Sequence, residues 1–127
     1  MAHLLVIDDD AAVRQTMRRM LQDAGHSVVE ADNGTSGLAQ LTQSPIDIVL
    51  TDIFMPGTEG VETIQQIRRL RPGMKIIAMS GSYSSEAYLN AAAKLGAQAI
   101  LKKPFRTAEL RDTINQVLAQ PVPNRPN

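Results

Sequence analysis

The stretch Leu4-Leu5-Val6-Ile7-Asp8-Asp9-Asp10 decides the fold class. Four consecutive apolar residues predict a strand buried on both faces, and the three aspartates that follow place a charged edge directly after it. Similar apolar runs begin near residues 27, 46, 75 and 97. Between these runs, apolar residues recur every three or four positions, which is typical of amphipathic helices. The sequence therefore predicts strands that alternate with helices.

The predicted strands cover residues 4–7, 27–31, 46–51, 75–79 and 97–101. The run 27–31 is half polar, as expected for an edge strand, whereas the last two runs are nearly unbroken apolar and predict strands covered on both faces. Right-handed helical crossovers between such strands give a doubly wound five-stranded parallel sheet in a three-layer α/β/α sandwich. The sequence thus predicts an α/β fold.

Helices are predicted from the same periodicity. The first begins at the N-cap Asp10 and stops at Gly25, and the second, of about ten residues, ends before Pro45. The others run through Val61, Ile64, Ile67 and Leu70, then through Tyr88, Ala91, Ala92 and Leu95, and finally over residues 107–119, where Leu110, Ile114, Val117 and Leu118 share a stripe.

Length and composition limit the remaining classes. The 127 residues, 13.8 kDa and 43% hydrophobic, suit one domain over residues 1–120, followed by a proline-rich tail or linker start over 121–127. Thirteen basic and thirteen acidic residues, with no Trp, argue against direct nucleic-acid binding. No apolar run reaches the roughly 20 residues of a membrane span, and the absence of cysteine fits a reducing compartment. We therefore expect a cytoplasmic protein with no membrane contact.

Polar residues stand after four of the predicted strands: Asp8-Asp9-Asp10, Asp52, Ser80-Gly81 and Lys102-Lys103-Pro104. Parallel strands deliver these residues to one edge of the sheet. Each has an ordinary explanation alone, for example Asp10 as a helix cap, but carboxylates pressed together repel each other unless a cation lies among them. Oxygen-only ligands favour Mg²⁺. Cysteine is absent, and His3 and His26, expected at the surface, lie away from these strand ends.

The same set suits phosphoryl transfer onto a carboxylate, which needs an oxygen nucleophile, a bridging metal and donors to the phosphoryl oxygens. Asp52 is the best nucleophile candidate because it is the isolated carboxylate at the centre of the sheet. Of the two adjacent lysines, one reaches the acidic edge, since successive side chains at a strand end point to opposite faces. We predict that Lys103, aimed by Pro104, points inward and that Lys102 points to solvent.

The chain resembles the receiver domain of two-component response regulators over residues 3 to about 120. The resemblance rests on residues 4–10, 48–57 with Gly60, 78–81 and 102–105, in that order. It implies a flavodoxin-like strand order 2-1-3-4-5. Members of this family are among the examples behind the rule on where such sheets bind ligands, so that rule gives no independent support.

The resemblance implies that Asp52 accepts a phosphoryl group from the phosphohistidine of a histidine kinase or phosphotransfer protein. Mg²⁺ would be held by Asp9, Asp52 and the backbone carbonyl of Phe54, with Asp8 acting mostly through a metal-bound water. Such a protein assists its own phosphorylation and dephosphorylation but is not an enzyme. Signal transduction would then follow from a change of surface.

Further roles come from the resemblance alone. Ser80 would donate a hydrogen bond to the phosphoryl group, Lys103 would pair with it, and Gly81 would leave room for its entry. The family's bond before the proline, here Lys103-Pro104, is cis. An unidentified effector, or a second copy joined on phosphorylation, would bind the face formed by the predicted helix 4, strand 5 and helix 5. At the family's aromatic switch position this chain has Ile100.

Three other classes compete with this interpretation. A haloacid-dehalogenase phosphatase needs a second aspartate two residues after the nucleophile, where this chain has Phe54. A flavodoxin-like FMN module would place its phosphate beside the acidic triplet after the first strand, which repels it. A receiver-like interaction module that works without phosphorylation is the third, and measuring phosphate incorporation separates it from a phosphoacceptor.

Overall fold

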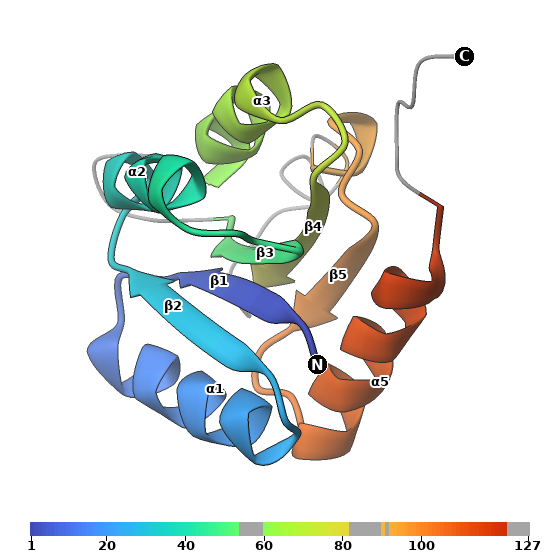
Figure 1. Cartoon of the computed structure of the whole chain (residues 1–127). Helices are drawn as coiled ribbons and strands as arrows, with labels where there is room; N and C mark the ends of the chain where they lie inside the picture. The colour runs from blue at the N-terminus through green and yellow to red at the C-terminus, as the bar shows by residue number, and fades with distance from the viewer. Residues whose placement is uncertain (54–59, 82–89, 91, 122–127) are drawn as a thin grey trace.

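A computed structural model describes residues 1–53, 60–81, 90 and 92–121. Within these residues a single parallel sheet has the order β2-β1-β3-β4-β5 (Figure 1). Its strands are β1 (His3–Ile7), β2 (Ser27–Ala31), β3 (Ile48–Asp52), β4 (Lys75–Ser80) and β5 (Ala99–Lys102). The predicted fold class and strand order are confirmed, and β2 is an edge strand as expected.

Helices cover both faces of the sheet (Figure 1). On one face lie α1 (Ala11–Asp23) and α5 (Thr107–Ala119), and on the other lie α2 (Gly34–Gln43) and α3 (Gly60–Leu70). Of the helix predicted through residues 88–95, residues 90 and 92–94 are helical, whereas Tyr88 and Ala91 lie outside the described residues. The three-layer sandwich is therefore present.

The alternation of side chains along β1 builds two separate cores. Leu4 and Val6 pack in one core with α1 and α5, while Leu5 and Ile7 pack in the other with α2 and α3. All four are fully buried. Because β1 is central and covered on both sides, its chain direction fixes where the aspartates after it emerge.

Helix α1 is capped at both ends by the predicted residues. The Asp10 carboxylate accepts hydrogen bonds from the backbone N–H groups of Ala12 and Val13, at 2.9 and 3.3 Å. Gly25 follows the helix with a φ of +94°, a left-handed conformation that favours glycine. The helix is therefore anchored directly beside the acidic edge of the sheet.

Two strand predictions were wrong at their limits. β3 begins at Ile48 rather than residue 46, because Asp47 makes hydrogen bonds to the backbone of His3 outside the ladder. β5 begins at Ala99 rather than residue 97, and it is an edge strand in which only Leu101 is buried, not a strand covered on both faces. Ile100 remains 36% exposed. An edge strand has a neighbour on one side only, so fewer of its side chains are enclosed.

The predicted apolar stripes of α3 and α5 are also too long by one residue each. Leu70 and Leu118 lie at or near the helix ends and are 40% and 36% exposed. No helix among the described residues has the length and apolar character needed to cross a membrane.

Candidate functional site

The carboxyl ends of the strands bring the predicted site residues together at one edge. Asp8 follows β1, Asp52 and Ser80 are the last residues of β3 and β4, and Lys103 follows β5. Asp8, Asp9 and Asp52 each offer a carboxylate oxygen, and these oxygens lie within 4.8 Å of one another. The structure therefore places a cluster of three carboxylates on the edge that the sequence indicated.

The three consecutive aspartates have different positions. Asp8 is fully buried, and its Oδ1 accepts a hydrogen bond from the backbone N–H of Asp10 at 2.9 Å. The Asp10 carboxylate caps α1. Asp9 is exposed to solvent beside the other two carboxylates. The triplet thus supplies one buried carboxylate, one solvent-facing carboxylate and one helix cap.

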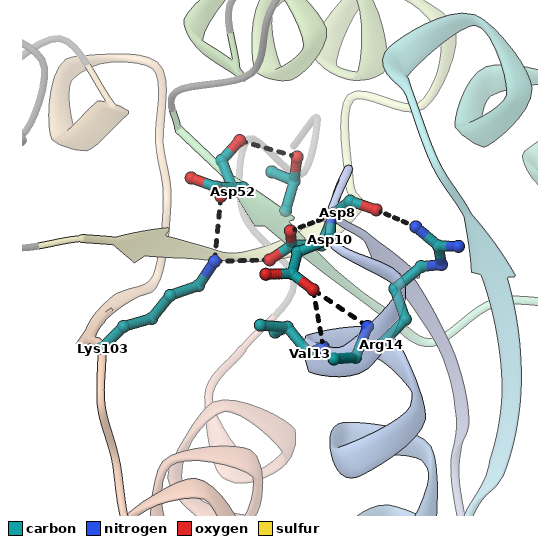
Figure 2. Close-up of polar contacts among 8 residues, drawn as sticks. Asp8, Asp10, Val13, Arg14, Asp52 and Lys103 are labelled. Atoms are coloured by element: carbon teal, nitrogen blue, oxygen red, sulfur yellow. Dashed lines mark hydrogen bonds and ion pairs between the residues drawn. The ribbon is translucent and has the colours of Figure 1, made fainter.

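Lys103 lies between two carboxylates of the cluster (Figure 2). Its Nζ is 2.5 Å from Asp8 Oδ2 and 2.9 Å from Asp52 Oδ2. Lys102 is exposed, so these contacts agree with the predicted choice between the two lysines. The Lys103–Pro104 bond is cis, as the resemblance implied.

The site perturbs two ionisable groups. Burial opposes the charge of Lys103, but its hydrogen bonds to Asp8 and Asp52 outweigh burial and raise the pKa of Lys103 above its ordinary value. The pKa of Asp9 is raised by partial removal from water and then by the neighbouring charge of Asp8. Both shifts have one cause in common, because negative charge is concentrated at this edge.

The remaining predicted residues are placed less fully. Ser80 is buried at the end of β4, and its carbonyl accepts a hydrogen bond from the Lys103 backbone N–H at 2.7 Å. Gly81 is exposed, and an added Cβ there would meet nothing within 4 Å, so the described surroundings do not require a glycine. Phe54, the predicted carbonyl ligand, lies outside the described residues. The roles of all these residues remain predictions.

Sequence reasoning missed Arg14. Its Nη1 donates to the carbonyl oxygen of Asp8 at 2.5 Å, and its Nε donates to Glu30 Oε1 at 3.3 Å (Figure 2 shows the first contact). No local pattern marks this role, because Arg14 is one of several arginines on α1 and its partner Glu30 lies on β2.

A groove of about 510 Å³ adjoins the acidic cluster on the α1 side. Its walls come from α1 and from the segment after β5, and most of its lining is apolar. The lining residues are Ala12, Val13, Thr16, Met17, Met20, Gly81, Lys103, Pro104 and Phe105. Lys103 therefore belongs both to the carboxylate cluster and to this groove.

The two histidines were expected at the surface, but both are half-buried and make hydrogen bonds. His3 Nδ1 lies 2.6 Å from Ser27 Oγ, and His26 Nδ1 accepts a hydrogen bond from the Ala2 N–H at 3.0 Å. Both side chains are half-buried at the amino-terminal edge of the sheet. They lie at the edge opposite the carboxylates, so they add nothing to that cluster.

Comparison with known families identifies the class of protein. The sequence model of the response regulator receiver domain matches residues 4–115. The chain therefore belongs to the response regulator receiver domain family.

Individual relatives agree with this assignment. The chain is 32% identical to the response regulator receiver protein CpdR of Brucella abortus, over 92% of this chain and 94% of that protein. It is also 32% identical to the transcriptional regulatory protein GlrR of Escherichia coli K12, over 96% of this chain but only 27% of GlrR. It thus spans about a quarter of the length of GlrR.

Solved structures agree as well. A CheY-like receiver domain protein from Methanospirillum hungatei JF-1 superposes with a TM-score of 0.88 at 31% identity, covering 93% of this chain and 94% of that one. Receiver segments also match inside longer signalling proteins, including the sensor kinase CckA of Brucella abortus, at 34% identity over 12% of its length.

Proposed function

We propose that Asp52 of this receiver domain accepts a phosphoryl group from the phosphohistidine of a histidine kinase or phosphotransfer protein. The observation that carries the proposal is the Lys103 ammonium held between Asp8 and Asp52 beside the solvent-facing Asp9. A carboxylate oxygen of Asp52 forms the new P–O bond. The P–N bond breaks, and the imidazole nitrogen takes its electron pair.

The donor set fits Mg²⁺. Three carboxylates and one ammonium leave an excess of negative charge at a site built from hard oxygen ligands. Asp9, Asp52 and the carbonyl of Phe54 would hold the ion, with Asp8 acting through a water. When bound, Mg²⁺ offsets the charge of the carboxylates and of the incoming phosphoryl oxygens.

The chain's own residues supply the remaining functions. Lys103 keeps its proton, because its pKa is raised, and pairs with the phosphoryl oxygens once Asp52 is modified. Ser80 donates its hydroxyl to the same group. The domain modifies itself and turns over no separate substrate, so it acts as a switch and not as an enzyme.

Labelling with acetyl phosphate and Mg²⁺ tests the acceptor. We expect the intact mass of the wild type to rise by one phosphoryl group and that of Asp52→Asn to stay unchanged. Asp32→Asn is the matched control, because Asp32 is an exposed aspartate directly after β2 and should leave labelling intact. Equal labelling of Asp52→Asn would overturn the assignment. No labelling of the wild type would instead favour an interaction module that works without phosphorylation.

The groove beside Lys103 offers a docking surface for the phosphodonor protein. It is continuous with the carboxylate cluster through Lys103 and is lined mainly by apolar side chains. Thr16 lines the groove and is exposed, whereas its neighbour Gln15 is exposed but does not line it. Thr16→Arg should slow transfer from a phosphohistidine protein while acetyl phosphate labelling persists. Gln15→Arg should change neither rate.

The signal would leave through the face that includes β5 and α5. Ile100 on β5 and Leu118 on α5 are both 36% exposed, so apolar surface is available on these elements. The helix 4 part of this face lies largely outside the described residues. An effector, or a second copy bound on phosphorylation, would cover it. Light scattering of the protein with and without acetyl phosphate separates these two partners.

A further inference from the structure

Arg14 joins the acidic turn after β1 to the edge strand β2. Its guanidinium donates to the Asp8 carbonyl through Nη1 and to Glu30 through Nε. The side chain is 17% exposed, so these contacts lie largely away from solvent. Within the described part of the chain, the carboxylate that Arg14 pairs with is that of Glu30.

Ala31 at the end of β2 and Arg14 on α1 hold the Asp8 backbone from two sides. The Asp8 N–H donates to the Ala31 carbonyl at 3.1 Å, while its carbonyl accepts from Arg14. Glu30, the residue before Ala31, orients Arg14 and also binds Arg18 at 2.5 Å. The ion pair between Glu30 and Arg14 thus holds the Arg14 side chain against the Asp8 carbonyl.

The Asp8 carbonyl belongs to the peptide unit that leads into Asp9. Since a peptide unit is planar, holding its oxygen fixes the direction in which the chain enters Asp9. We infer that Arg14 is a positioning residue that acts through this peptide to keep the Asp9 carboxylate facing Asp52, with Glu30 holding Arg14 in place. The inference rests on the Mg²⁺ site of the proposed function, to which it adds a determinant of affinity.

Simple electrostatics predicts the opposite effect. A guanidinium close to the carboxylates repels a cation, so its removal by charge alone would tighten Mg²⁺ binding. Loss of positioning weakens binding instead, and outer residues that orient metal ligands typically change affinity by about 10- to 100-fold. The direction of the change therefore separates the two explanations.

The test is an NMR titration of the full chain with MgCl₂, following the amide signals of residues 8–10. Arg14→Ala should raise the Kd about tenfold. Arg18→Ala is the matched control, because Arg18 lies on the same helix and binds the same glutamate, whereas the contact to the Asp8 carbonyl comes from Arg14. It should stay within about twofold of the wild type. Arg14→Lys, which keeps the charge but cannot bridge both acceptors as a fork, should lie between them.

Thermal unfolding of the same variants tests whether a loss of stability accounts for the change in Kd. Glu30→Gln provides a second route if Arg14→Ala fails to fold, and it should weaken Mg²⁺ binding by a few fold while leaving the Asp8 contact possible. A Kd for Arg14→Ala equal to or below the wild-type value would overturn the inference alone. A wild type that shows no Mg²⁺-dependent shifts would overturn the metal site of the proposed function, and the inference with it.

Discussion

The two edges of the sheet differ in the partners of their charged side chains. At the amino-terminal edge, Arg68 donates to backbone carbonyls of Pro72, Met74, Leu95 and Gly96. At the same edge Asp47 accepts from the His3 N–H, and His26 accepts from the Ala2 N–H. These polar side chains are paired with neutral backbone groups, so they serve the fold.

At the carboxyl-terminal edge, charges face charges. Asp8, Asp9 and Asp52 crowd together, and the Lys103 ammonium contacts two of them. Such a cluster is costly unless a further cation joins it. The comparison teaches that buried polarity alone does not mark the functional site of this domain. The candidate site is distinguished by an excess of negative charge, which a bound cation would offset.

The largest expected effect separates the two adjacent lysines of the functional edge. Lys103→Ala should slow phosphorylation of Asp52 roughly 30- to 900-fold, which corresponds to about 2–4 kcal/mol in activation free energy. Alternatively, it should abolish the conformational response to phosphorylation. The reason is that its ammonium faces the site of developing negative charge. Rates of labelling by acetyl phosphate measure the effect. Lys102→Ala should change the rate by less than about twofold, since that side chain is exposed.

Mutation at the amino-terminal edge should lower the free energy of unfolding without changing the labelling of Asp52. Arg68→Ala leaves several partly buried carbonyls without their donor, so we expect a loss of about 2–3 kcal/mol in the free energy of unfolding. Urea denaturation measures it. Labelling of the folded variant at low temperature should match the wild type. A large defect in labelling of folded Arg68→Ala would break the comparison between the edges.

Much of the fold and of the site was predictable because both depend on local patterns. The unbroken apolar run from Leu4 to Ile7 predicts a strand covered on both faces, and parallel strands necessarily bring their carboxyl ends to one edge. Asp8 and Asp52 could therefore be placed together from their positions alone. The inward direction of Lys103 followed from alternation and from the proline after it.

The rest depends on distant contacts that no local pattern contains. Arg14 and Arg68 look like ordinary helix arginines in the sequence, and their roles arise only when other segments bring carbonyl oxygens to them. The exposure of Ile100 follows from the edge position of β5, which an apolar run does not reveal. Long side chains reach across elements, so their partners are set by tertiary packing.

Mg²⁺ should stabilise the functional edge by mass action. At a concentration several-fold above its Kd, it should raise the free energy of unfolding by about 1 kcal/mol or more. Asp9→Asn removes one proposed ligand and one repelling charge, so it should lose most of this response while raising the metal-free melting temperature. Melting curves with and without millimolar MgCl₂ measure both. A wild type indifferent to Mg²⁺ would show that the charge imbalance is not corrected by this ion.

The smallest expected effect belongs to His26 at the amino-terminal edge. Burial, and then the charge of the N-terminus, lower the pKa of His26 from its ordinary value of 6.5. The folded state therefore holds the neutral ring, whose Nδ1 accepts from Ala2, while the unfolded chain takes up a proton first as the pH falls. The His26 contribution to stability is present above pH 6.5 and is lost as the pH falls through the lowered folded pKa. At most about 1 kcal/mol of the free energy of unfolding is involved, comparable to one hydrogen bond.

Urea denaturation between about pH 7.5 and 5.5 should show a steeper loss of stability for the wild type than for His26→Gln, which does not titrate in that window. Parallel curves for the two proteins would mean that the ring of His26 is not held neutral in the folded state, and the comparison between the two edges would then fail.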